Sequence, residues 1–232
     1  MASSSAGGMS LFRALFLAFA QLGDPRLRGP LVKSLVLTIV SFAAIWIAMG
    51  WVVTHTRIFE TLWLDWTIDA LGGLALAVLS FVLFPAVVVA FVGLFLDEVA
   101  DAVQARHYPN APPPRKRPLM VEIFSSLQLV ALAIVLNLLV LPLYFVPGLN
   151  LAIFLATNGF LLAREYVTML AARRLDSHEA RRFWKSRRGQ AWLVGISFAA
   201  LSAIPVVNLA VPVLAVAATA HLVESWLPAS GE

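Results

Sequence analysis

Two long stretches without a charged residue constrain the fold of this chain more than any other feature. Leu35–Val53 holds nineteen such residues, and Ala70–Leu96 holds twenty-seven, interrupted by Pro85. A helix needs about 20 apolar residues to cross a hydrocarbon core of roughly 30 Å. The chain is 60% hydrophobic and 13% charged, whereas soluble domains carry about 25% charge. The sequence therefore predicts an all-α integral membrane protein with spans at about 31–53 and 70–96, the second kinked at Pro85.

The remaining apolar sequence forms two pairs of segments with similar turns. The first turn, Phe145–Ala152, and the second, Ala203–Ala210, both contain Pro-x-x-Asn-Leu-Ala. Each follows an apolar arm and precedes another arm that ends in polar residues. This pattern predicts an internal repeat of helical hairpins, at about 120–166 and 189–226; a chance recurrence in a Leu/Ala-rich chain is the alternative.

The hairpin tips carry no charge, and the apolar part of one arm is short. Leu151–Ala163 is thirteen residues long, which spans ~20 Å as a helix. Irregular backbone is tolerated inside a membrane where protein or a water-filled cavity covers it. We therefore expect hemi-penetrating, re-entrant hairpins, although the eighteen residues of Val206–Val223 reach ~27 Å and could cross fully.

The positive charges predict one orientation. Only Arg57 of the seventeen Lys and Arg residues lies between 54 and 69; the others lie in the N-terminal segment, around 97–118 and in 164–188. The positive-inside rule makes that shared face, and the N-terminus, cytoplasmic. Six full spans would give the same orientation.

The chain is expected to form one membrane domain, 11–226, between a disordered tail at 1–10 and a second tail at 227–232. An amphipathic cytoplasmic extension is predicted at 97–108 and a basic cytoplasmic loop at 167–188. That loop interleaves basic residues with Phe183 and Trp184, which favours anionic lipid headgroups over nucleic acid as its partner.

The sequence gives little support for catalysis. It has no Cys, and its four His residues show no metal-ligand spacing. Asp176 before Ser177 and Glu179 is typical of a helix N-cap with a first-turn acid. We expect no enzyme activity, catalytic residue, metal or cofactor.

Five polar residues in the hairpins are candidates for a polar path or pore. Arg164 and Glu165 form either a cytoplasmic interface pair or a buried network, because charges in membrane cores usually face a cavity. Asn150 and Asn208 either cap helices at the hairpin tips or line a pore. Asn158 is assigned to the same polar network.

The chain resembles the CysZ sulfate-permease family and its wider etoposide-induced-protein superfamily. The likeness runs from about Leu11 to Trp226. It is carried by Gly159-Phe-Leu-Leu-Ala-Arg-Glu-Tyr166, by the turn Pro205–Asn208 and its preceding basic loop, and by the segment from Asp97 to Pro109. The resemblance implies a homo-oligomeric bacterial inner-membrane protein with two spans and two hemi-penetrating hairpins, passing sulfate toward cysteine synthesis.

The resemblance also implies where sulfate binds. In the permease branch a Gly-Leu-Arg-Arg stretch before the first span binds sulfate; here Leu27 and Arg28 match its middle, whereas Arg26 and Gly29 replace its ends. The expected site comprises Gly23, Arg26, Leu27, Arg28 and Gly29, with helix-start N–H groups and the Arg28 guanidinium as donors. The departure from the motif leaves a second reading open, a non-transporting structural or lipid-interacting membrane protein of the same superfamily.

Overall fold

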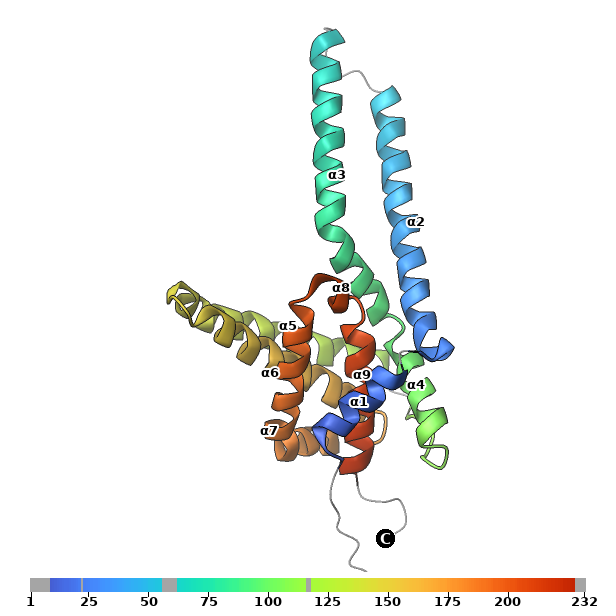
Figure 1. Cartoon of the computed structure of the whole chain (residues 1–232), viewed down its shortest axis with the longest axis vertical. Coiled ribbons are helices and arrows are strands. Elements are labelled where there is room, and N and C mark those ends of the chain that lie inside the picture. Colours follow the sequence, from blue (N-terminus) through green and yellow to red (C-terminus); the bar gives the residue numbers. More distant parts are fainter. Residues whose placement is uncertain (1–8, 22, 56–61, 116–117, 228–232) are drawn as a thin grey trace, which may run out of the picture.

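The computed structural model describes residues 9–21, 23–55, 62–115 and 118–227, and every regular element in these ranges is helical (Figure 1). The elements are α1 Leu11–Gln21, α2 Pro25–His55, α3 Leu62–Gly93, α4 Leu96–His107, α5 Leu119–Val140, the 3₁₀ helix η1 Leu141–Phe145, α6 Asn150–Ala171, α7 Ser177–Ser202, α8 Pro205–Asn208 and α9 Val211–Trp226. The predicted all-α membrane fold is confirmed. Most of the expected 1–10 tail and residues 228–232 lie outside the described residues.

The helices α2 and α3 form a long pair that rises away from the rest of the protein (Figure 1). Within the described residues, three segments are long and apolar enough to cross a membrane: Pro25–Val52, Ala70–Gly93 and Met120–Phe145. The first two correspond to the predicted spans, and Pro85 lies inside α3. Their large aliphatic side chains are mostly exposed, as expected where lipid is the solvent.

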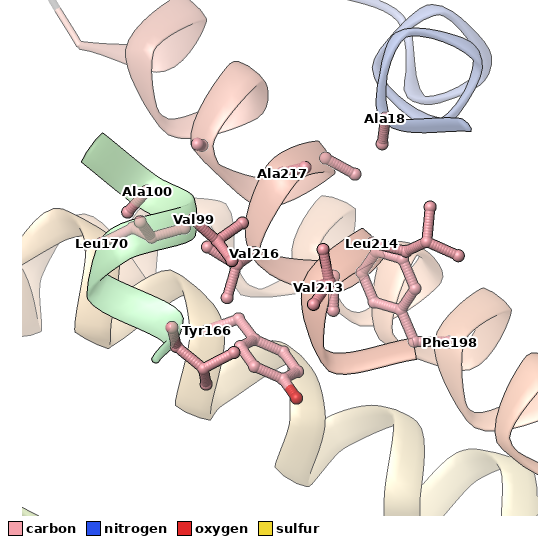
Figure 2. Packing of buried hydrophobic residues seen from close by; sticks show 14 of the residues in the cluster. Ala18, Val99, Ala100, Tyr166, Leu170, Phe198, Val213, Leu214, Val216 and Ala217 are labelled. Atoms are coloured by element: carbon pink, nitrogen blue, oxygen red, sulfur yellow. The ribbon is translucent and has the colours of Figure 1, made fainter. Parts of the chain in front are cut away.

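The core of the base is α9, whose residues Val211–Val223 are all buried. It is covered by α1, α4 and α6, with α3 and α7 also in contact. Figure 2 shows Val213 and Val216 of α9 pointing toward Tyr166 of α6, while Leu214 lies beside Phe198 of α7. A helix that is apolar on every side needs this kind of complete enclosure.

The α5–α6 hairpin projects sideways from the base, across the direction of α2 and α3 (Figure 1). Its tip contains Gly148, whose φ of 83° is a left-handed conformation that glycine adopts without a steric penalty. The segment Met120–Phe145 has the length and composition of a span, so helix length alone does not distinguish a re-entrant arm from a crossing one.

Three features differ from the sequence-based expectation. Helix α6 continues to Ala171, so Arg164 and Glu165 lie within it rather than at its end. The segment 167–188, expected as a loop, is mostly helical, because α6 runs into it and α7 begins at Ser177. The N-terminal helix α1 was not predicted.

The expected N-cap is confirmed: Asp176 Oδ1 accepts from the N–H groups of His178 and Glu179, each at 2.8 Å.

Candidate functional site

The expected anion-binding segment forms the first turns of α2, at the base of the first span. Arg26 and Arg28 are exposed, whereas Leu27 is only 2% exposed and belongs to the core. Leu27 therefore anchors the turn, and its two arginine neighbours are held at the surface. Of the five residues expected to bind sulfate, these two carry the groups able to pair with an anion.

The backbone donors of this turn are already used. Asp24 accepts a hydrogen bond from the Arg26 N–H at 2.9 Å through its side chain. Its carbonyl accepts from the N–H groups of Leu27 and Arg28, at 3.0 and 3.1 Å. The helix start therefore offers fewer free N–H groups than the sequence suggested, because Asp24 caps it. Contacts to an anion here would come from guanidinium groups.

Asp24 also carries a charge that acts on this segment. The backbone hydrogen bond from Arg26 and the side-chain hydrogen bond from Arg106 hold the pKa of Asp24 below its ordinary value. The carboxylate is therefore ionised at neutral pH, and Arg106 pairs with it directly. An anion at Arg26 and Arg28 would meet a site in which one carboxylate is already neutralised by a third arginine.

A polar cluster lies next to this segment and joins α1, α4 and α9. The Gln21 Nε2 atom is 2.8 Å from His221 Nε2 and 2.9 Å from His107 Nε2. The Tyr108 hydroxyl is 2.9 Å from His221 Nδ1. With the amide nitrogen donating to both rings, each imidazole is neutral, and the Nδ1–H of His221 donates to Tyr108.

Burial controls the protonation of this cluster. Desolvation lowers the pKa of His221, which lies outside the three candidate spans, to about 4, and the charge of His107 adds to the shift. Desolvation also lowers the pKa of His107. It raises the pKa of Tyr108 to about 12, with a smaller contribution from Glu224. All three groups are therefore neutral at pH 7, and the cluster is a hydrogen-bonded joint between helices.

Ion pairs connect the start of α4 to α2 and to the segment after α6, and a further pair connects that segment to α9. Arg173 pairs with Asp97 at 2.6 Å and with Asp101. Glu98 pairs with Lys33 of α2 at 2.6 Å. The largely buried Arg174 pairs with Glu224 of α9 at 2.6 Å. These pairs engage Arg173 and Arg174 with carboxylates of α4 and α9.

The three candidate asparagines lie on the hairpins and bond locally. Asn150 Oδ1 accepts from the N–H of Leu151 at 2.8 Å, and Asn158 Nδ2 donates to the Phe154 carbonyl at 2.9 Å. Asn208 ends α8, and its backbone N–H donates to the Ile204 carbonyl. The structure brings none of the three to the Arg26–Arg28 segment.

Arg164 and Glu165 are both partly buried in the middle of α6. Within the described part of the chain, neither side chain forms an ion pair. The Arg164 carbonyl accepts a hydrogen bond from the Thr168 hydroxyl. Their predicted network therefore has no charged partner among the described residues.

Two hollows in the described part of the chain are too small or too apolar to hold an anion. One, of about 20 Å³, is lined by Tyr108, Arg174, Glu224 and their neighbours; a single water needs about 10–15 Å³, so it holds no more than a water or two. The other, of about 520 Å³, is open on α3 between Leu71 and Val82 and is lined by leucine, valine and alanine side chains. It offers an anion no donor.

Sequence reasoning missed the cluster of Gln21, His107, Tyr108 and His221. Its members are separated by up to 200 positions, and no sequence motif joins all four. The available signal was a histidine inside an otherwise apolar helix, since a buried imidazole nearly always has a hydrogen-bond partner.

Comparison with known proteins identifies the family. The profile described as sulfate transporter CysZ/etoposide-induced protein 2.4 matches residues 14–212. Curated proteins give no match to this chain. The matched region contains α2, α3, the complete α5–α6 hairpin and the Arg26–Arg28 segment. Because the match covers well over half of the chain and agrees with the helical membrane architecture, the protein belongs to the sulfate transporter CysZ/etoposide-induced protein 2.4 family.

Proposed function

We propose that this protein is a sulfate channel or permease of the bacterial inner membrane that supplies sulfate for cysteine synthesis. The observation that carries the proposal is the family match over residues 14–212. It is supported by the pair of exposed arginines at the start of the first span. Sulfate is a dianion with acceptors only, so guanidinium groups suit it.

In this proposal Arg28 makes the principal contact and Arg26 the second. Gly23 and Gly29 keep the surroundings open: a Cβ at Gly29 would meet no atom within 4 Å, and one at Gly23 only a carbonyl oxygen at 3.8 Å. The charge of Arg106 offsets that of Asp24, which would otherwise repel the anion. Leu27 fixes the turn by its burial.

The proposed topology places the N-terminus in the cytoplasm, with α2 and α3 spanning and both hairpins re-entrant. Its support is the uncharged hairpin tips and the sideways direction of α5 and α6 relative to α2 and α3 (Figure 1). Asn150, Asn158, Arg164, Glu165 and Asn208 then contribute to a polar path within a homo-oligomer. The basic first half of α7 meets anionic headgroups.

A non-transporting, lipid-interacting role is the second candidate. It is favoured by the exposed basic residues of α7, namely Arg181, Arg182, Lys185 and Arg188, and by the loss of free backbone donors at the start of α2. Anionic lipid attracts each such residue by roughly 1 kcal/mol.

The deciding experiment is sulfate flux into liposomes that contain only this protein. We expect uptake above that of protein-free liposomes, reduced in Arg28→Ala and partly restored in Arg28→Lys. Lys185→Ala, which changes a basic residue on α7, is the matched control and should keep full flux. Wild-type uptake no faster than that of empty liposomes would favour the second candidate.

A further inference from the structure

The helix α1 has two opposite faces of unusual composition. Its buried residues are Ala14, Ala18 and Gln21, and both alanines are 0% exposed. The other face carries Phe12, Phe16 and Phe19, at 83%, 71% and 45% exposure. Both sets repeat at four and then three residues, so each forms one stripe along the helix. The small residues are inside, and the bulky aromatic residues are outside.

The rotation of α1 is fixed by its contacts. The alanine face packs on α9, and Figure 2 shows Ala18 pointing toward that helix. At the end of α1, Gln21 hydrogen-bonds to His221 of α9 and to His107 beyond it. Turning the phenylalanines inward would break these two bonds and force large rings against a helix that is already fully enclosed. The outward direction of the stripe is therefore a stable feature of the fold.

This arrangement is the reverse of that in water-soluble proteins and matches that of membrane helices. In lipid, helices approach one another through small residues, because the acyl chains solvate bulky apolar side chains as well as protein does. The whole of α1 contains one charge, Arg13. Only three residues separate it from α2, whose first exposed large hydrophobic residues are Val32, Leu35 and Val36. The stripe is thus linked within a few residues to a surface that faces lipid.

We propose that α1 is a lipid-facing element and that Phe12, Phe16 and Phe19 insert among lipid acyl chains where α1 covers α9. The partner is the hydrocarbon of the bilayer, not a second copy of the chain and not water. In this arrangement α1 screens α9 from lipid on that side and ties the cytoplasmic end of the first span to the base. The proposal is independent of whether the protein transports sulfate.

The chain lacks cysteine, so single nitroxide labels can test this directly in liposomes. Labels are placed at Phe12→Cys and Phe16→Cys, and collisions are measured with oxygen, which concentrates in hydrocarbon, and with a water-soluble nickel complex. Phe81→Cys on α3, 83% exposed in a candidate span, is the lipid reference. Asn110→Cys, exposed in the turn after α4, is the aqueous reference, and Ala14→Cys is the protein-packed reference.

We expect both labels to match Phe81→Cys, with high oxygen and low nickel accessibility. Nickel accessibility equal to that at Asn110→Cys would show that the stripe faces water and would overturn the proposal. Low accessibility to both reagents, as at Ala14→Cys, would show that another protein surface covers the stripe, and would overturn it equally. All the substituted positions except Ala14 are exposed, and the melting temperature of each variant in detergent confirms that it is folded.

Discussion

Gly159 of α6 and Gly195 of α7 are in direct backbone contact. A Cβ atom added to Gly195 would lie 1.9 Å from the Gly159 carbonyl oxygen, and one added to Gly159 would lie 2.7 Å from the backbone nitrogen of Ile196. Ala163 lies in the same contact, because its Cβ is 2.8 Å from the position that a Cβ on Gly195 would take. The two helices therefore touch along small residues, as in close-packed membrane helices.

Replacing Gly195 by alanine should separate α6 from α7. The obstructing atom is a backbone oxygen that cannot rotate away, so we expect Gly195→Ala to lower the free energy of unfolding by about 1–3 kcal/mol or more. Thermal melting in detergent measures this. Gly189→Ala on the same helix is the matched control, since its Cβ would meet nothing within 4 Å; equal melting temperatures for the two variants would contradict the contact.

Removing Arg28 should weaken sulfate binding. A hydrogen bond to a charged group contributes about 1.5–3 kcal/mol, so the affinity of Arg28→Ala should fall roughly tenfold to over a hundredfold. Arg28→Lys should recover only part, because it retains the charge and loses the two-pronged geometry. Calorimetry on purified wild type, both variants and Arg26→Ala measures this. Sulfate affinity unchanged in Arg28→Ala would place the site elsewhere.

The hairpin tips should be inaccessible from the periplasm. Single cysteines at Leu149 and Val207 should react slowly with a membrane-impermeant maleimide added outside, because a re-entrant tip stops within the membrane. A cysteine at Thr61, in the segment between the two predicted spans and outside the described residues, should react fast. Equal rates at all three positions would instead indicate six full spans.

Single substitutions of Arg164 and Glu165 should have small effects on stability. Neither side chain pairs with a charge in the described ranges, and both are partly exposed. We therefore expect Arg164→Ala and Glu165→Gln each to change the free energy of unfolding by less than about 1 kcal/mol. Thermal melting in detergent tests this. A loss of several kcal/mol, as when a buried pair is broken, would reveal a charged partner.

Acid should destabilise the hydrogen-bonded cluster around His221. Its folded pKa of about 4 lies below the ordinary histidine value of 6.5, so the unfolded state binds the proton more readily. The resulting stability is complete above pH 6.5 and is lost as pH falls toward 4, at about 1.4 kcal/mol per unit of pKa difference. The lowered pKa of His107 acts in the same direction.

The measurement is the melting temperature of wild type and His221→Gln across this pH range. Glutamine keeps hydrogen-bonding groups and removes the titration, so the variant should be less stable at pH 7 and less sensitive to acid. Carboxylates contribute equally to both curves, so the difference between the curves isolates the histidine. Parallel curves would show that His221 is not held neutral by the fold.

The sequence by itself determined the features that depend on local composition. The runs that begin at Leu35 and Ala70 contain no charged residue and are long enough to predict spanning helices. Each charged residue placed in hydrocarbon would add its own free-energy cost, so the preference can be read from consecutive residues. The capping box at Asp176 is likewise complete within four residues. The Gly159–Tyr166 motif, together with the Pro205–Asn208 turn and the Asp97–Pro109 segment, indicated the family, which the profile match confirmed.

Only the tertiary structure decided which distant residues meet. Gln21 and His221 are 200 positions apart, and their pairing depends on how α1 and α9 are rotated about their axes. Arg106 and Asp24 are 82 positions apart, and their pairing likewise depends on how α4 packs beside the start of α2. Hydrophobicity determines that a helix is buried or faces lipid, whereas side-chain partners are fixed by the packing of several helices at once.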